Sequence, residues 1–403
     1  MDKRKVYQWS NKHINASNMK VIILLIPLMG LFIQRCVNGQ YNLESFLDIS
    51  ILISFFTLFI CEALASWLLS HINAKCEDAV KLTEDYETLV QKYSREELIE
   101  YNGVVLPESC LAFRKKDEVS FLFDIELDVT SPVYQLPTQI AECSDELMKA
   151  HEHSVKYNNM NVRLNDCRQE GNKLKLLYGR TTYFDSLVSN RAMDFPIKDK
   201  SIREIYEPGP FLSPLSESKL SNHLGFNGFV ELQGGKIIFV HRNADVSIGK
   251  KTLGTSVATS YKVKYGLDNK RNMTAEYMGN AIRMGIYEEL KIQIPTEIKL
   301  EECIFSFYRD LVEGGKPQFL FYLRLPELTV EKFENQFFEI YQQEGKENQK
   351  EVITDGSKFE YFTIEEMRTF NYICDGFKME NGTKFKMMPS AVVSMILLLK
   401  HLE

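Results

Sequence analysis

Two apolar segments within the first seventy residues constrain the fold of this chain more than any other feature. The second, Ile49 to Leu69, is about twenty residues long and carries Glu62 as its only charge, which suits a hydrocarbon core of about 30 Å. The first, Val21 to Ile33, is shorter and spans a bilayer only if residues 34–37 are included, with Arg35 reaching the headgroups. We therefore predict a two-helix transmembrane hairpin over residues 21–72. The alternative for the first segment is a secretory signal peptide, which also has a basic start and a short apolar core.

The distribution of basic residues orients the predicted hairpin. Basic residues precede the first segment and Lys75 follows the second, whereas the connector from Val37 to Asp48 has none. By the positive-inside rule both termini are cytoplasmic, with residues 1–20 as a cytosolic N-terminus. Glu62 then lies in the bilayer, where a carboxylate costs about 2.5–3.5 kcal/mol and usually faces a partner or water. It is either a functional intramembrane group or a protonated one that is hydrogen-bonded within the hairpin.

The composition narrows the classes of function. A net charge of −7 and an isoelectric point near 5.7 argue against a protein that coats DNA or RNA, which would be basic. The eight cysteines are scattered without a CxxC pair, so neither a disulfide framework nor a zinc site is indicated. We expect no cofactor and no resident metal.

The remaining chain divides by its hydrophobic pattern. The pattern of apolar residues among charged ones in residues 73–102 predicts a linker helix. This helix either packs on its own domain or pairs with neighbouring subunits as a stalk. Residues 103–159 form an extension, and residues 160–403 the main domain. The strand-like runs lie at 110–114, 120–127, 161–164, 174–177, 228–232, 236–241, 303–308 and 319–325. Helical patterns lie at 275–292, 329–344, 363–370 and 389–402, and together they predict an α+β fold with an antiparallel-capable sheet.

One helical stretch, Met273 to Ile292, carries the motif that points to chemistry. Glu276 stands twelve residues before Glu288, which forms a pair with Glu289, and Ile292 follows as a closing aliphatic residue. In this spacing the chain resembles the Nudix family, whose box places a glutamate at the same distance before a Glu-Glu pair. The flanks GFVELQGGKIIFVHRNADV, IFSFYRDLVEGGKPQFLFYLRL and FEYFTIEEMRTF are similar to the strands and helix around such a box. The resemblance implies a Nudix-like mixed-sheet domain over residues 160–403.

The departures from the Nudix box decide what the resemblance implies for activity. Met284 and Gly285 replace the family's Arg-Glu pair, and Lys270 and Lys291 replace its glycines. An active box gathers several carboxylates around a divalent metal, because Mg²⁺ requires oxygen ligands that offset its charge. Gly285 removes one of them, so we predict a domain that binds without hydrolysing. Arg283 replaces the missing arginine only if the helix shifts its register.

The whole arrangement resembles the membrane effectors of bacterial cyclic-oligonucleotide anti-phage systems (CBASS), one class of which joins two transmembrane helices to a Nudix-like domain. The resemblance implies a multi-pass inner-membrane protein. Its head binds a cyclic oligonucleotide, forms homo-oligomers and disrupts the membrane, with lipid but no DNA or RNA as a partner. The alternatives are a membrane-tethered Nudix hydrolase of nucleoside diphosphate compounds, and a membrane scaffold whose head binds protein.

A cyclic oligonucleotide carries phosphates and bases, so its pocket needs guanidinium groups and aromatic rings. The candidate ligand-binding residues lie at strand ends and in the upstream stretch NVRLNDCRQEGNKLKLLYGRTTYFDSLVSNR, which is similar to an extension of some large Nudix-like proteins. They are Arg180, Tyr183, Arg242, Tyr308 and Arg309. For each of them the alternative is an ordinary solvated or core side chain.

Overall fold

The computed structural model describes residues 83, 85–93, 98–114, 121–149, 151, 157–171, 173–243, 246, 249–266, 272–348 and 356–403, together with Leu64. The chain divides into two compact units, Met1–Lys81 and Leu82–Glu403. Of the first unit only Leu64 is described. All that follows concerns the second unit.

A mixed nine-stranded sheet forms the centre of the second unit. Its strands follow the order β1-β2-β12-β13-β8-β9-β10, with β11 paired to β8 and β14 paired to β9. Their bounds are β1 Leu98–Tyr101, β2 Val104–Arg114, β8 Gly225–Leu232, β9 Lys236–His241, β10 Leu253–Gly254, β11 Val257–Ser260, β12 Ile304–Asp310, β13 Lys316–Leu325 and β14 Lys358–Phe362. Strands β13 and β8 run parallel, and the other pairs are antiparallel.

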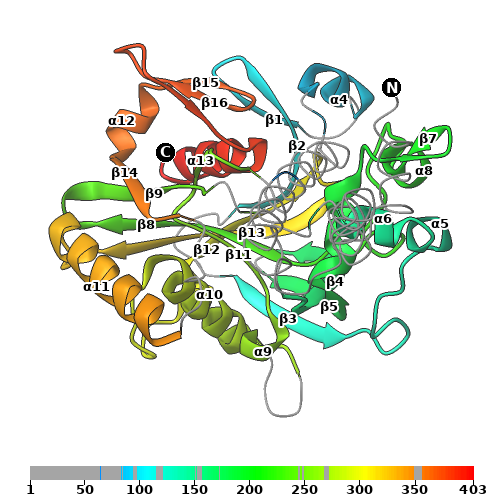
Figure 1. Cartoon of the computed structure of the whole chain (residues 1–403), viewed down its shortest axis with the longest axis horizontal. Helices are drawn as coiled ribbons and strands as arrows, with labels where there is room; N and C mark the ends of the chain where they lie inside the picture. Colours follow the sequence, from blue (N-terminus) through cyan, green and yellow to red (C-terminus); the bar gives the residue numbers. More distant parts are fainter. Residues whose placement is uncertain are drawn as a thin grey trace, which may run out of the picture. The chain divides into compact units, whose positions relative to one another are not determined.

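Helices cover both faces of this sheet (Figure 1). On one face lie α10 (Ala275–Leu290) and α11 (Val330–Asn348), whose buried side chains, among them Ile282 and Phe333, pack with Phe226 and Phe319 of the sheet. Thr274 is the N-cap of helix α10, and its side chain accepts a hydrogen bond from the N–H of Tyr277. On the opposite face lies α13 (Pro389–His401), which packs on Phe229, Phe239 and Leu320.

Smaller elements surround the central sheet. A three-stranded sheet of β3 (Leu122–Leu127), β5 (Lys173–Thr182) and β4 (Met160–Glu170) adjoins it through Leu164, Leu174 and Leu176, which share its core. A second consists of β15 (Asn371–Ile373), β16 (Gly376–Lys378) and β17 (Lys384–Lys386), and β6 (Pro196–Ile197) pairs with β7 (Lys200–Ser201). The remaining helices are α4 Tyr86–Lys92, α5 Thr138–Ala141, α6 Ser144–Lys149, α7 Tyr183–Val188, α8 Ile202–Tyr206, α9 Val263–Gly266 and α12 Ile364–Arg368, with short 3₁₀ turns η3 Asn190–Ala192, η4 Gln233–Gly235 and η5 Leu300–Cys303.

The central sheet divides at β8, and this division creates the site described below. Strand β9 pairs with β8 only through Glu231–Ile237 and Leu232–Lys236. Further along, β10 pairs with the end of β9 through Leu253 and Gly254, whereas β11 pairs with the other end of β8, from Gly225 to Gly228. Between β8 and β9 the Ser256 side chain takes the place of ladder hydrogen bonds, since its hydroxyl accepts the N–H of Val230 and donates to the carbonyl of Ile238.

The prediction of a transmembrane hairpin is not supported. Among the described residues no helix combines the length and apolarity needed to cross a bilayer. The predicted α+β fold with a membrane hairpin is therefore corrected to a mixed α/β fold with helices on both faces of its sheet. The predicted multi-pass inner-membrane location is not supported either. The segment 21–72 itself, including Glu62, lies outside the described residues apart from Leu64.

The helical prediction for residues 73–102 is also wrong where the structure describes that segment. Helix α4 covers only Tyr86–Lys92, and Leu98–Tyr101 form strand β1, which pairs with β2. Ile99 is buried against α13's core, so a two-residue alternation was present but too short to recognise. From residue 160 on, the predicted strands and helices all have counterparts in the structure.

Candidate anion-binding site

A cavity of about 80 Å³ lies at the division of the sheet, beneath the first turn of α13. Strands β8, β10, β11 and β13 surround this cavity, and the hairpin between β12 and β13 closes one side of it. Its lining is mostly polar or charged and consists of Arg191, Asn227, Arg242, Leu253, Gly254, Thr255, Ala258, Thr259, Ser260, Glu313, Lys316, Gln318, Met388, Ser390 and Ala391. We refer to this cavity as the basic pocket.

Three cationic side chains and one carboxylate give the basic pocket its charge. Arg191, Arg242 and Lys316 line it together with Glu313, so these four groups leave a balance of two positive charges. Lys316 is 5% exposed and Glu313 is 3% exposed. A buried charge interacts with its neighbours far more strongly than an exposed one, so the pocket is suited to an anion.

Glu313 is ionised within this group. Its Oε2 lies 3.0 Å from Lys316 Nζ, and its Oε1 lies 3.6 Å from Arg191 Nε. Burial alone would raise the pKa of Glu313, but the charges of Lys316 and Arg191, the Lys316 hydrogen bond and Arg242 hold that pKa below its ordinary value. The carboxylate thus offsets part of the positive charge in the empty pocket.

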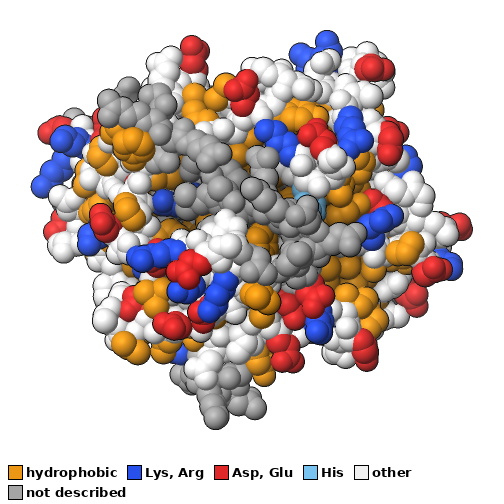
Figure 2. All heavy atoms as spheres, turned by 180° about the vertical axis from the view of Figure 1, so that it is seen from behind, with side chains coloured by type: hydrophobic (Ala, Val, Ile, Leu, Met, Phe, Trp, Pro, Cys, Tyr) orange, Lys and Arg blue, Asp and Glu red, His pale blue; other side chains and the backbone are white. Residues whose placement is uncertain are grey.

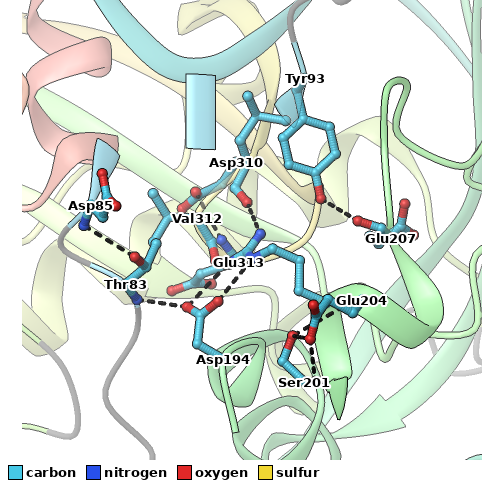
Figure 3. A network of polar contacts seen from close by, with 12 residues as sticks. Thr83, Asp85, Tyr93, Asp194, Ser201, Glu204, Glu207, Asp310, Val312 and Glu313 are labelled. Atoms are coloured by element: carbon cyan, nitrogen blue, oxygen red, sulfur yellow. Dashed lines mark hydrogen bonds and ion pairs between the residues drawn. The ribbon is translucent and has the colours of Figure 1, made fainter. Parts of the chain in front are cut away.

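Arg203 holds the turn that carries Glu313, and Figure 3 labels Asp194, Val312 and Glu313 of this polar network. The Arg203 guanidinium is buried, donates to the carbonyls of Leu311 and Val312 at 2.8 and 2.7 Å, and pairs with Asp194 at 3.0 Å. Asp194 also accepts the backbone N–H of Thr83 at 2.6 Å. These bonds fix the main chain just before Glu313.

Packing and stacking hold the two arginines of the pocket. The side chain of Arg242 lies across Gly254, where a Cβ would come within 3.3 Å of Arg242 Cδ, so the glycine leaves the space that this side chain uses. Arg191, in η3, donates from Nη1 to the Tyr183 hydroxyl at 2.7 Å and lies over the same ring at 5.3 Å. Such a cation–π contact restrains the guanidinium.

Neutral polar groups line the wall below α13. Asn227 of β8 donates to the Tyr308 hydroxyl at 3.0 Å, and that hydroxyl donates to the carbonyl of Ser390 at 3.3 Å. Helix α13 begins with Pro389, which has no N–H, and the N–H groups of Ala391 and Val392 donate to the Met388 carbonyl. The positive end of the α13 dipole still adds to the cationic character of the pocket.

Two buried histidines interact with the cations of the pocket, although burial is the larger influence on both. His223 contacts Ser260 at 3.2 Å, and burial, then Lys316 and Arg191, lower its pKa well below the ordinary value. The pKa of His151 falls to about 4 through burial and the charges of Arg191 and Lys250. Both imidazoles are consequently neutral at pH 7, and the positive charge of the site comes from lysine and arginine.

The structure brings only part of the predicted ligand-binding set to this pocket. Arg242 lines it, and Tyr183 supports it through Arg191. Tyr308 is fully buried, is not among the lining residues, and accepts a hydrogen bond from Asn227, so it is a structural residue of the wall and not a ring exposed in the pocket. Arg309 is 3% exposed and donates to the Gly315 carbonyl at 3.0 Å, which makes it part of the hairpin and not of the pocket. Arg180 lies in β5, where its backbone pairs with residues 132–134, away from the lining residues.

The residual Nudix box does not gather its carboxylates. Glu276 is exposed in the first turn of α10, and at about 1.5 Å per residue it lies roughly 18 Å along the axis from Glu288. Glu288 forms an ion pair with Lys262. Among the described residues no group of three or more potential metal ligands is found.

The two positions that break the box have structural roles around α10. A Cβ at Gly285 would lie 2.6 Å from Thr259 Cγ2, so the glycine lets α10 pack closely on β11. Arg283 binds Asn280 and donates to the carbonyl of Ile298 at 2.7 Å. It therefore fastens the loop after α10 and does not replace the box arginine.

Sequence reasoning missed Arg191, Asn227, Glu313, Lys316 and Gln318. A signal for two of them was present, because Asn227 and Gln318 are polar residues inside otherwise apolar runs, GFNGFVEL and PQFLFYL. In central strands such residues need partners, which places them at a site or a buried network. Arg191 carried no comparable signal.

Comparison with known proteins gives no family assignment for this arrangement. No protein-family model matches the chain, and no curated protein matches it. The Nudix and CBASS resemblances thus remain predictions from sequence.

Proposed function

We propose that the unit Leu82–Glu403 is a ligand-binding domain that holds a phosphate group of a nucleotide in the basic pocket without hydrolysing it. The observation that carries the proposal is the convergence of Arg191, Arg242 and Lys316 on one cavity at the N-terminus of α13. Arginine and lysine beside a helix N-terminus are the groups that recognise phosphate most strongly in proteins.

The attraction for anions is local to this pocket. The chain has a net charge of −7, and on the face seen in Figure 2 acidic and basic side chains are interspersed. Among the described side chains of that face, the basic ones do not form a continuous surface of the kind that holds nucleic acid. A nucleotide would therefore be recognised through one enclosed phosphate and not through a broad electrostatic field.

The size of the cavity limits what enters it. A volume of about 80 Å³ compares with roughly 10–15 Å³ for one water on the same measure. It accommodates one phosphate group with a few waters and excludes a whole cyclic dinucleotide. In this proposal the ligand is a cyclic oligonucleotide, as the CBASS resemblance suggests, with one phosphate in the basic pocket and its bases outside.

The box residues support the non-hydrolytic part of the proposal. Glu288 is neutralised by Lys262, and Gly285 has no carboxylate and no space for one beside Thr259. We further propose, on the resemblance alone, that ligand binding promotes oligomerisation. Moving a two-state assembly from 1:99 to 99:1 requires about 5.5 kcal/mol of differential binding, which several subunits sharing ligands would supply together. Membrane disruption forms no part of the proposal.

The test uses the full chain with inorganic phosphate and with cyclic dinucleotides, followed by isothermal titration calorimetry. Arg242→Gln should weaken binding about tenfold or more, because a hydrogen bond to a charged group contributes about 1.5–3 kcal/mol. Arg168→Gln is the matched control, since Arg168 is 72% exposed and is not among the lining residues, and the substitution removes the same charge.

Turnover is measured in parallel with Mg²⁺ and nucleoside diphosphate compounds. We expect binding without turnover, and no effect of Glu288→Gln. Robust turnover that Glu288→Gln abolishes would favour the hydrolase instead. Absence of binding at micromolar concentrations of every cyclic dinucleotide would reject that ligand class, and equal losses in Arg242→Gln and Arg168→Gln would reject the pocket.

A further inference from the structure

One carboxylate sits inside a pocket that otherwise attracts anions, and its placement points to a competitive role. We propose that Glu313 is an internal competitor for the ligand: its carboxylate engages Lys316 and Arg191 in the empty pocket, and a bound phosphate takes these two cations from it. The inference rests on the proposed function and concerns the regulation of the same site.

The distances show that Glu313 uses the groups that a phosphate would use. Its two carboxylate oxygens face different cations, with Oε2 3.0 Å from Lys316 Nζ and Oε1 3.6 Å from Arg191 Nε. Glu313, Lys316 and Arg191 all line the cavity. A phosphate oxygen that binds the same ammonium and guanidinium therefore competes with the carboxylate for these donors. The two negative charges also repel each other.

The main chain keeps the competitor in place. The Glu313 N–H donates to Asp310 Oδ1 at 3.1 Å, and the Glu313 carbonyl accepts from Asn190 Nδ2 at 2.8 Å. Arg203 binds the two preceding carbonyls. The turn then continues through Gly314 and Gly315, both with positive φ. The carboxylate is thus presented by a fixed turn and does not reach the pocket by chance.

The same carboxylate has two effects of opposite sign. In the empty protein it offsets the burial of Lys316, which at 5% exposure would otherwise be costly to keep charged. Toward a ligand it cancels one of three positive charges and occupies hydrogen-bond donors. Removing the charge should therefore destabilise the empty protein and strengthen anion binding, whereas a residue with only a structural role would weaken both.

A selectivity follows from this competition. A monocarboxylate offers the cations nothing that Glu313 does not already provide, so acetate should bind poorly. Phosphate offers more charge and a third acceptor oxygen, and it should displace the carboxylate from its cations. Without Glu313, the discrimination between phosphate and acetate should shrink.

The experiment compares full-length wild type, Glu313→Gln and the control Glu331→Gln, an exposed residue of α11 that loses the same charge. The probes are inorganic phosphate and acetate, measured by calorimetry and thermal unfolding. We expect Glu313→Gln to bind phosphate about tenfold tighter or better, a difference of about 1.4 kcal/mol. Its melting temperature without anion should fall below that of wild type and recover with phosphate. Glu331→Gln should bind like wild type.

A second variant keeps the test decisive if Glu313→Gln fails to fold. Glu313→Asp retains the charge but shortens its reach to Lys316 and Arg191, so it should bind phosphate more tightly than wild type and less tightly than Glu313→Gln. Unchanged or weaker phosphate binding in a folded Glu313 variant, while Arg242→Gln still weakens it, overturns the competitor and leaves the pocket intact. Absence of phosphate binding in the wild type and in both Glu313 variants overturns the anion pocket itself.

Discussion

The close packing of α10 on β11 can be tested with a single methyl group. An alanine at Gly285 would place its Cβ 2.6 Å from Thr259 Cγ2, against the roughly 3.5–4.0 Å of an ordinary carbon contact. The overlap should cost about 1–3 kcal/mol of stability. Replacing glycine by alanine inside a helix returns about 1 kcal/mol. We therefore expect Gly285→Ala to destabilise the protein by a net ~1 kcal/mol.

The partner of this contact gives the decisive comparison. Thr259→Ser removes Cγ2, and the nearest remaining contact of the added Cβ is then Thr259 Cβ at 3.2 Å. In the Thr259→Ser background Gly285→Ala should stabilise by about 0.5–1 kcal/mol, because mainly the helix propensity remains. The coupling between the two positions is then roughly 2 kcal/mol.

The assay is urea unfolding followed by circular dichroism, with midpoints compared at a common slope. Gly279→Ala is the matched control in the same helix. Its Cβ would overlap with the flexible end of the Glu301 side chain, which can turn away, and would lie 3.3 Å from the Glu301 backbone N. We expect Gly279→Ala to be neutral or stabilising. If Gly285→Ala alone raises the midpoint as much as Gly279→Ala does, the close approach of α10 to Thr259 is refuted.

Three further predictions concern the turn and the residues around the pocket. Arg203→Leu should destabilise the protein by about 3 kcal/mol or more in urea unfolding, because it leaves the partly buried Asp194 without its cation and the carbonyls of Leu311 and Val312 without their donor. A loss below about 1 kcal/mol would contradict this role of Arg203. Burial and the neighbouring Glu313 raise the pKa of Asp310 to about 7 from its ordinary 3.8, so between these values the folded state retains a proton that the unfolded state has released, and the contribution of Asp310 to stability falls as pH rises. Asp310→Asn should therefore remove this dependence and be more stable than wild type at pH 8 but not at pH 4, and a pH-independent difference between the two proteins would contradict it. Lys262→Met should destabilise the protein by leaving Glu288 unpaired, and the double variant Lys262→Met/Glu288→Leu should recover stability; additive losses would show that the two side chains do not interact.

Local pattern was sufficient to place most elements of the domain. The period of apolar residues predicts α10 and α13, and the runs before and after Gly234-Gly235 predict β8 and β9. These signals are local, because an element that buries one face has apolar residues that repeat with the period of a strand or of a helix. Residues 98–101 show the limit, because a four-residue strand is too short to give a reliable period.

The pocket could not be predicted in the same way, because it depends on how the sheet divides. Arg191, Arg242 and Lys316 come from a 3₁₀ turn, the end of β9 and the start of β13. No local pattern shows that β11 takes the place of β9 beside the first half of β8. Tyr308 and Arg309 illustrate the opposite error. A strand end suggests exposure, but β12 lies between β2 and β13 and its end is covered by the hairpin that follows.

Helix α10 shows that a sequence can match the spacing of a motif although its side chains do not form the site that the motif implies. In α10 the position of the missing carboxylate is occupied by a glycine that contacts Thr259, and Thr259 also lines the basic pocket. A glutamate at position 285 would push α10 away from β11 and so disturb the wall of that pocket. The glycine at position 285 therefore accounts both for the absent box carboxylate and for the close packing beside the pocket. On the function proposed here, Gly285→Glu should therefore weaken phosphate binding in calorimetry, because it disturbs the packing of α10 on Thr259 beside the pocket.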